Sequence, residues 1–497
     1  MSGIRVTYSG LVSFGINLIS VVTGLVFTLI VTRKLSVEEF GTWGLINGII
    51  IYAMVISPII TYWVSREVAR GERTAKTAII SNGVLSIAGV VIYLVAAFIV
   101  GLQSDADLNI LLFATILIPI LFIEHSLTAI NLGHNPQASS YGFLVFEILK
   151  ILAALLLIYY LKFGVEGAIL ASFIAYIGKI GIQAFYSKDQ LRSKLQKNYL
   201  IKWLKLFWVP TYRTLPSLLA SSDVVIFSIM TGSVVGVAYY TSARTIGLLV
   251  NHVRGLNKGL YPKLLESEKH EFLQENLIKS FYFAFPLLAF SITFAKPGLF
   301  ALNPIYQIAA PIVILIGVRT FLTTFNRMLY DAHLAMEDID KEGRKASSKD
   351  YARSKLVFIP TLEIAKQGIY VGVLAILLYI YSSQTDSVID LVFYWVAISL
   401  VIEIPITLYM TYLTKKSFKI KIDRISIFKY LLTSVIVFGI IGLFMEENLE
   451  YKNSIFEFLP SLLLYAIISI IGYLVITYLI DNRTRSLIKG IMNEVKK

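Results

Sequence analysis

The chain has 497 residues, of which 56% are hydrophobic and only 15% are charged. Soluble proteins average nearer a quarter charged residues, and a soluble chain of this length would form several domains with polar surfaces. The composition therefore excludes soluble enzymes, DNA-binding proteins and disordered scaffolds. It predicts an all-α polytopic membrane protein, whose net charge of +13 must first be tested against the positive-inside rule.

Long apolar segments follow one another along the chain. A helix needs about 20 mostly apolar residues to cross a bilayer, and about 14 segments meet this requirement. The runs are continuous rather than alternating, which excludes a transmembrane β-barrel. The first is followed by Arg33 and Lys34 and has no small-residue cleavage site, so it is a retained span and not a signal peptide. The predicted spans, with boundaries good to a few residues, are 7–32, 41–63, 77–101, 108–132, 141–161, 165–186, 206–231, 234–256, 277–295, 306–333, 354–381, 388–414, 428–445 and 457–480.

Basic residues distinguish the two sides of these spans. Most of the 45 Lys and Arg residues fall in the N-terminus, the even-numbered connections and the C-terminus. The positive-inside rule then places both termini in the cytoplasm. The excess of basic residues is thus explained mostly by the orientation of the chain in the membrane. Stretches such as 415–429 would also attract anionic membrane lipids, and nucleic acid is not an expected partner.

The connections on the outer side are too short to hold a domain. A membrane glycan polymerase or ligase usually carries a sizeable external loop, so the chain is not expected to be an enzyme. One external Asp-x-Asp sequence, Asp105 to Asp107, fits either a metal–nucleotide site or a solvated turn, and the turn is favoured. The chain has no cysteine and its five histidines lack metal-binding spacing, so neither a metal site nor a cofactor is predicted.

Few charged residues lie within the predicted spans, where a charge is costly and normally faces a cavity or a partner. Three sets have helical spacing that allows pairing, which would neutralise the charges and hold helices together. Glu124 beside His125 fits either a proton or cation site or a helix end near the headgroups. Asp223 and Asp331 are further candidates for coupling-ion binding or gating. The three spaced sets are Glu147 with Lys150, Arg327 with Asp331, and Glu363 with Lys366.

Arginines are concentrated in spans 7, 8 and 10, with few acidic residues nearby. Arginine suits phosphate because its planar guanidinium binds oxyanions through two parallel hydrogen bonds and stays charged. Arg319 and Arg327 are about two turns apart and share a helix face. The set favours a cationic, water-filled cavity for a phosphate or pyrophosphate. Snorkelling to the interface is the alternative, especially for Arg213, and Asp331 could neutralise Arg327. The set consists of Arg213, Arg244, Arg319 and Arg327.

Three motifs occur in an order typical of a known family. They are the hairpin Val31-Thr-Arg33-Lys-Leu-Ser-Val-Glu-Glu39-Phe40-Gly41, the segment from Asp223 to Arg244 with Gly236 and Tyr239, and Asn326-Arg327-Met-Leu-Tyr-Asp331-Ala332 at the end of span 10. In these motifs, and in hydropathy over nearly its whole length, the chain resembles the polysaccharide-export flippases of the multidrug/oligosaccharidyl-lipid/polysaccharide (MOP) superfamily. Each motif is short, and their order and spacing carry the resemblance.

The resemblance implies two six-helix lobes around a central cavity, followed by two C-terminal helices. A weak internal repeat agrees, because residues 36–43 align with 233–240 as tight external turns, although two apolar hairpins can also match by chance. Family members often have fewer spans, and spans 13 and 14 would line a lipid groove or simply pack. The predicted divisions are an N-terminal lobe at 1–186, a basic cytoplasmic linker at 187–205, a C-terminal lobe at 206–414, and a segment at 415–497 with a basic loop, two spans and a cytoplasmic tail.

The resemblance also implies a function. The chain would be a multi-pass plasma-membrane flippase that moves a polyprenyl- or dolichyl-(pyro)phosphate-linked oligosaccharide from the cytoplasmic to the outer leaflet by alternating access. Arg33 and the span arginines would hold the phosphate, and an H⁺ or Na⁺ gradient or the membrane potential would drive transport. The partners would be this lipid-linked glycan, membrane lipids and glycan-assembly enzymes. The alternatives are a MOP-type cation-coupled small-molecule antiporter and a membrane glycan polymerase or ligase.

Overall fold

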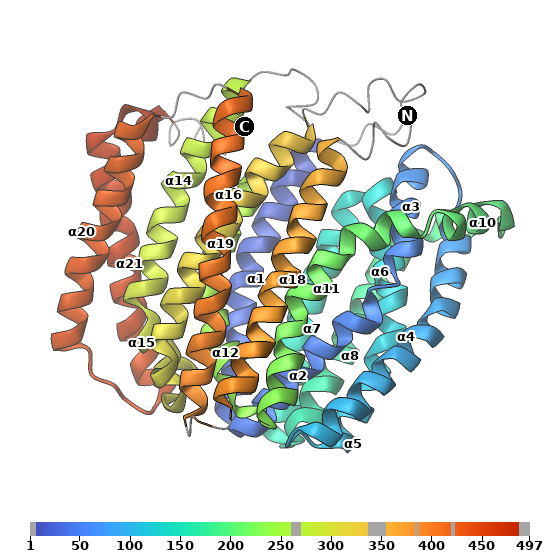
Figure 1. Cartoon of the computed structure of the whole chain (residues 1–497), viewed down its shortest axis with the longest axis horizontal. Helices are drawn as coiled ribbons and strands as arrows, with labels where there is room; N and C mark the ends of the chain where they lie inside the picture. The colour runs from blue at the N-terminus through green and yellow to red at the C-terminus, as the bar shows by residue number, and fades with distance from the viewer. Residues whose placement is uncertain are drawn as a thin grey trace. The chain divides into compact units, whose positions relative to one another are not determined.

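The computed structural model describes residues 6–259, 270–335, 354–382, 384, 387–418 and 423–486. Over these residues the chain is helical and has no strand, which confirms the all-α class (Figure 1). Eleven of the described helices are long and apolar enough to cross a membrane, and α2 (Val37–Met54) with α3 (Pro58–Ala69) raises this to 12 if the bent pair is one span. The remaining two predicted spans coincide with α1 (Val6–Lys34) and with α12 (Val235–Gly247) followed by η3 (Leu248–Gly259).

The chain forms two compact units. The first comprises residues 1–241 and 363–391, and the second comprises residues 242–362 and 392–497. Three helices therefore have residues in both units, namely α12, α18 (Lys355–Tyr381) and α19 (Val388–Phe418). The lobe boundaries drawn from the sequence stay a prediction.

Helices of the first unit pack closely on one another. Helix α7 packs on α8 and α1, and α6 packs on α3, α4 and α8. These contacts gather the polar residues of α6, α7 and α8 within one bundle. Besides those already introduced, the helices of this unit are α4 (Ala75–Gln103), α5 (Leu108–Phe113), η1 (Ala114–Ile116), α6 (Leu117–His134), α7 (Pro136–Ala154), η2 (Leu155–Tyr160), α8 (Gly164–Tyr186), α9 (Lys188–Leu191), α10 (Lys197–Lys205) and α11 (Trp208–Thr231).

The second predicted span is bent by 68° between α2 and α3. Pro58 begins α3 and has no N–H to continue the preceding helix, so the chain turns at this point. The buried amide of Asn82 on α4 donates to Ser57 Oγ at 3.1 Å, to the Phe122 carbonyl at 2.8 Å and to Ser126 Oγ at 2.9 Å. Asn82 thereby ties the bend to both α4 and α6.

The turn between α4 and α5 contacts the turn between α11 and α12 at the end of the first unit where α5 lies (Figure 1). Asp105, before α5, accepts from the Val234 N–H at 2.7 Å and from Ser233 Oγ at 3.1 Å. Asp107 caps α5 by accepting from the Asn109 N–H at 2.8 Å. Both carboxylates of the Asp-x-Asp sequence thus stabilise turns. This agrees with the turn interpretation and adds a tertiary bond that sequence spacing does not reveal.

Helix α2 approaches α11 and α12 closely at the same end. A Cβ added to Gly41 would lie 2.1 Å from the Val234 carbonyl oxygen, and one added to Gly44 would lie 2.7 Å from Thr241 Oγ1. A methyl group at position 41 would overlap a backbone carbonyl, so the helices would have to separate, whereas one at position 44 would displace the side chains of Thr241 and Val237. The glycine of the first hairpin motif is therefore required by close backbone packing in addition to any role in the turn.

The second unit places its last two helices on α14 through tyrosines. Pro286 within α14 lacks an N–H, so the Tyr282 carbonyl one turn earlier has no helical donor. Tyr473 on α21 donates to this carbonyl at 2.7 Å, and both tyrosines are buried. The remaining helices here are α14 (His270–Thr293), α15 (Ala295–Leu302), η4 (Pro304–Ala309), α16 (Ala310–Ala335), α20 (Arg424–Asn448) and α21 (Ile455–Ile480).

Gly41→Ala should destabilise the protein by about 1–3 kcal/mol, because the added methyl overpacks against a backbone carbonyl. Gly181→Ala is the matched control, since a Cβ at this helical glycine meets nothing within 4 Å. It should be neutral or stabilise by up to about 1 kcal/mol. Thermal unfolding in detergent measures both. Equal stability of the two variants would contradict the close approach of α2 to the α11–α12 turn.

Tyr473→Phe should cost about 1 kcal/mol in the free energy of unfolding, because it leaves the Tyr282 carbonyl without a donor. In a Pro286→Ala background residue 286 regains an N–H for that carbonyl. The same Tyr473→Phe change should then cost clearly less. A double-mutant cycle by unfolding in detergent tests this, and additive effects would rule out the proline–tyrosine coupling.

Candidate functional site

Two lysine–glutamate pairs lie inside the first unit. Lys179 Nζ on α8 is 2.7 Å from Glu124 Oε1 on α6, and Lys150 Nζ is 2.9 Å from Glu147 Oε1, both on α7. Both carboxylates are buried and both lysines are largely buried. The second pair was predicted from helical spacing and is confirmed.

Threonine hydroxyl groups donate further hydrogen bonds to the two carboxylates. Thr128 Oγ1 donates to Glu124 at 2.6 Å, and Gln183 Nε2 donates to Thr128 at 2.8 Å. Thr23 Oγ1 on α1 donates to Glu147 Oε2 at 2.8 Å. Each charge therefore has partners from two or more helices, which is how an ionisable group is accommodated away from water.

One aromatic side chain lies beside both pairs. The Phe146 ring centroid is 4.9 Å from Lys150 Nζ and 5.8 Å from Lys179 Nζ. Tyr176 packs on Phe146 with ring centroids 4.6 Å apart. The two pairs thus form one connected cluster, called here the α6–α8 charge cluster and defined by Glu124, Glu147, Lys150 and Lys179.

His125 lies at the edge of the α6–α8 charge cluster. Its Nε2 is 3.8 Å from Glu124 Oε2, and its side chain is 43% exposed, whereas Glu124 is buried and bound to Lys179. Sequence analysis missed Lys179 as the partner of Glu124 because the two residues are on different helices. The role of Glu124 and His125 in ion coupling stays a prediction.

A second polar group joins α11 to α18. Tyr370 Oη donates to Asp223 Oδ2 at 2.8 Å, and Asp223 is buried. About one turn before Tyr370, Lys366 Nζ lies 3.0 Å from Glu363 Oε1, so this spaced pair is also confirmed. The tyrosine hydroxyl that satisfies Asp223 could not be identified from sequence, since nothing local to Asp223 points to span 11.

The predicted phosphate-binding arginines fall in both units. Arg33 ends α1 and Arg213 lies on α11, with Arg213 Nη1 3.4 Å from Tyr62 Oη. Arg244 is in the last turn of α12 and is exposed, while Arg319 and Arg327 are on α16. The cavity that would bring them to one phosphate stays a prediction.

Arg327 belongs to a polar group of the second unit. Neighbouring Asn326 donates to Glu403 Oε1 on α19 and, at 2.7 Å, to Thr407 Oγ1. Arg327 follows Asn326 directly on α16. The pairing of Arg327 with Asp331 stays a prediction.

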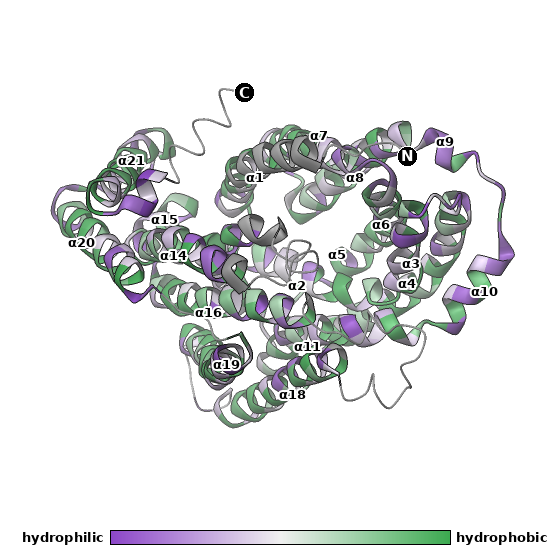
Figure 2. Ribbon diagram, turned by 90° about the horizontal axis from the view of Figure 1, so that it is seen from above, coloured by the Kyte–Doolittle hydropathy of each residue, from purple (hydrophilic) through white to green (hydrophobic). Residues whose placement is uncertain are grey.

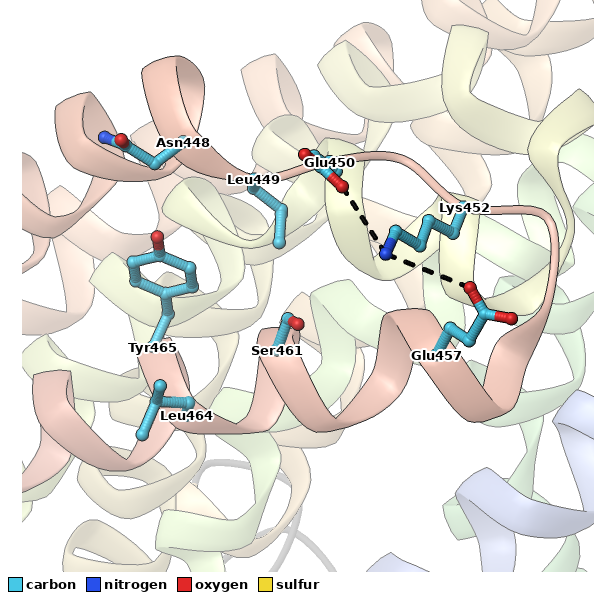
Figure 3. Close-up of a pocket in the computed structure, with 8 residues that line it drawn as sticks. All are labelled: Asn448, Leu449, Glu450, Lys452, Glu457, Ser461, Leu464 and Tyr465. Atoms are coloured by element: carbon cyan, nitrogen blue, oxygen red, sulfur yellow. Dashed lines mark ion pairs between the residues drawn. The ribbon is translucent and has the colours of Figure 1, made fainter.

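A small pocket lies at the turn between α20 and α21 (Figure 3). Its volume is about 190 Å³, and Lys452 Nζ on its rim is 3.4 Å from Glu450 and 3.9 Å from Glu457. Sites for small organic ligands usually occupy about 300–1,000 Å³ and are mostly apolar. This pocket is smaller and is bordered by three exposed charged residues that pair with one another, so it does not have the character of a substrate site. Among the described residues no group of three or more His, Asp or Glu side chains is placed to hold a metal ion.

Solved structures share this arrangement of helices. The lipid II flippase MurJ in an inward closed conformation matches with a TM-score of 0.67 and 14% identity, over 96% of this chain and 99% of MurJ. An inward-facing multidrug resistance MATE transporter of the MOP superfamily matches with a TM-score of 0.60 and 16% identity, over 82% of this chain and 99% of its own. The chain has the MOP fold.

A third MOP transporter, from Pyrococcus furiosus, matches with a TM-score of 0.53 and 15% identity, over 84% of this chain and 96% of its own. No family model and no curated protein sequence matches the chain. The MOP fold agrees with the resemblance seen in the sequence motifs. At these identities the likeness concerns the fold, so the activity has to be argued from the residues of this chain.

Lys179→Met should destabilise the protein by about 3–5 kcal/mol, because it leaves the buried Glu124 carboxylate without its cation. Adding Glu124→Gln should recover most of this loss. Exposed Lys188, just after α8, provides the control, and Lys188→Met should have little effect. Unfolding temperatures in one detergent compare the four proteins. Equal instability of the single and double variants would show that the pair is not an isolated ionic contact.

Proposed function

We propose that this chain is a flippase for a polyprenyl- or dolichyl-linked oligosaccharide carrying a phosphate or pyrophosphate. It would move the lipid-linked glycan from the cytoplasmic to the outer leaflet of the plasma membrane by alternating access. The product would feed surface polysaccharide or glycoprotein glycan assembly. Both termini would be cytoplasmic, and glycan-assembly enzymes would be the partners.

The main support is the extent of the likeness to MurJ. That flippase matches over 96% of this chain, whereas the two MATE and MOP transporters compared above match over 82% and 84%. The share of this chain that those transporters leave unmatched is about the size of the segment that follows α19. A MurJ-like layout would include α20 and α21, and α21 contacts α14 through Tyr473.

Chemistry supports an anionic substrate. The arginines predicted for the cavity keep their charge at any physiological pH and have the planar geometry that suits phosphate oxygens. Arg244 and Arg327 are exposed rather than buried against carboxylates. A phosphate passing through a low-dielectric region needs such compensation, because an unpaired anion there is costly. We assign the phosphate contact to Arg244 and Arg319 first, with Arg213, Arg327 and Arg33 in supporting positions.

A cation-coupled small-molecule antiporter of the MATE type is the second candidate. The α6–α8 charge cluster favours it, because two buried carboxylates beside lysines can exchange a proton or a cation for the internal ion pair. The same cluster could couple an ion gradient to glycan flipping, so the two candidates differ in substrate rather than in this site. Membrane glycan polymerases and ligases have no such support, since the compared structures are transporters and flippases.

Depletion of the protein followed by lipid extraction tests the function. Lipid-linked glycan should accumulate on the cytoplasmic side and surface glycan should fall. If surface glycan persists and no such lipid accumulates, the flippase proposal fails. The antiporter is favoured instead if gradient-driven efflux of small cationic compounds is lost on depletion and Glu124→Gln abolishes it.

Arg244→Ala and Arg319→Ala should each lower glycan flipping about tenfold or more, because a charge-assisted hydrogen bond to phosphate contributes about 1.5–3 kcal/mol. Exposed Arg424, at the start of α20, is the control, and Arg424→Ala should flip normally. The measurement is surface-glycan recovery in depleted cells at equal expression of each variant. Full recovery by the Arg244 and Arg319 variants would remove the phosphate assignment while leaving the depletion result standing.

A further inference from the structure

The connection between α8 and α11 is bound to the first unit along its length. The Gln196 N–H donates to Thr77 Oγ1 at 2.8 Å, and the Lys76 N–H donates to Ser193 Oγ at 3.3 Å. Gln196 Nε2 also donates to the Arg73 carbonyl at 3.2 Å. These bonds join the connection to the start of α4, so it is a fixed element of this unit and not a loose tether.

One side of α10 is buried in the protein. Trp203 has no exposed surface and belongs to a core cluster with Ile60, Val64 and Ile130. Tyr199, one turn earlier on the same side, packs against this cluster. The contacts of Trp203 and Tyr199 with this cluster determine which sides of α10 face away from the protein core.

A second side of α10 is apolar and exposed. Ile201 is 52% exposed and Leu204 is 48% exposed, and they share one face because they are three residues apart on a helix. The apolar surface continues past the end of the helix with Phe207 at 51% and Trp208 at 60%. Apolar side chains gathered next to several lysines are typical of a helix that lies in a membrane interface.

Lysines border this apolar side. Lys197 and Lys205 lie four residues before and after Ile201, and both are exposed. Over the part of the chain that the structure describes, neither lysine takes part in an ion pair. Long lysine side chains placed in this way can extend their ammonium groups to headgroup phosphates while their stems stay in the apolar layer.

The acidic residues beside the connection already have partners in it. Lys202 Nζ is 2.8 Å from Glu67 Oε1, and Glu67 is buried. A hydrogen bond to Glu72 raises the pKa of Tyr199. The buried Glu67 carboxylate is therefore paired with Lys202, and within the described part of the chain no ion pair joins it to Lys197 or Lys205.

The direction of α10 fits an interfacial position. Helix α10 crosses the end of the first unit sideways, whereas α4 and α6 run along it (Figure 1). Seen from above, α10 is at the outer edge of this unit, with polar and apolar residues alternating along it (Figure 2). A helix that runs across the ends of the spans has the orientation expected of a helix in the membrane interface.

We propose that α10 is an interfacial helix that binds anionic phospholipid headgroups of the leaflet predicted to be cytoplasmic. Ile201 and Leu204 enter the boundary of the acyl chains, and Lys197 and Lys205 contact the phosphates. Trp203 holds the helix to the protein from the opposite side. The connection between α8 and α11 would thus attach the first unit to an anionic leaflet.

The first experiment measures the depth of α10. The native chain has no cysteine, so single variants Ile201→Cys and Arg73→Cys can carry a nitroxide label in full-length protein. Arg73 is an exposed residue of the turn before α4. In vesicles of phosphatidylcholine and phosphatidylglycerol, the label at 201 should collide more with oxygen than with a water-soluble nickel complex, and the label at 73 should do the reverse. A label at 201 that is equally open to nickel, or shielded from both reagents as in contact with a second copy, overturns the proposal.

The second experiment measures the headgroup preference. Purified full-length protein is titrated with phosphatidylglycerol and bound lipid is counted by native mass spectrometry. Lys197→Gln with Lys205→Gln should weaken binding about 25-fold, at about fivefold per lysine. Glu67→Gln with Lys202→Gln removes the ion pair between α3 and α10 without changing the net charge, and should change binding less than about twofold. Equal binding by the Lys197/Lys205 variant and the parent, or an equal loss in both variants, overturns the assignment.

Discussion

The absence of water within a bilayer constrains every polar group in this chain. A buried charge or a free backbone carbonyl has to find its partner inside the protein, because the surrounding lipid offers none. Glu124 therefore binds Lys179, Asp223 binds Tyr370, and the carbonyl freed by Pro286 binds Tyr473. Each of these bonds joins separate helices, so satisfying the polar groups also sets which helices are neighbours.

The same constraint connects fold and function. A transporter has to present charge to its substrate, yet an uncompensated charge in a span is costly. This chain keeps its intramembrane acids mostly in internal pairs, as Glu147 with Lys150 and Glu363 with Lys366 illustrate. The exposed positions of Arg244 and Arg327 differ from this pattern and support the proposal that they meet an anion. At the membrane surface, Lys197 and Lys205 follow the same logic with lipid phosphates.

Local patterns in the sequence predicted contacts that are local in the structure. The pair Glu147 and Lys150 follows from i,i+3 spacing, and the helical class and approximate spans follow from apolar length. The partner of Glu124 did not follow, because Lys179 is on another helix and any of several lysines would have served. The clamp from Asp105 to Val234 escaped sequence analysis for the same reason, since an Asp-x-Asp pattern carries no information about a distant turn.

The sequence by itself determined that this protein is a helical membrane protein. It also determined that most basic residues lie in the connections on one side of the membrane and that few charged residues lie within the spans. Hydropathy and charge are properties of single residues. They can therefore be summed along the sequence without knowledge of the three-dimensional fold. Only the tertiary structure decided which glutamate faces which lysine, why Gly41 has no room for a methyl group, and that α10 turns Ile201 and Leu204 away from the core. These outcomes depend on the packing of helices from distant parts of the chain, which no local pattern encodes.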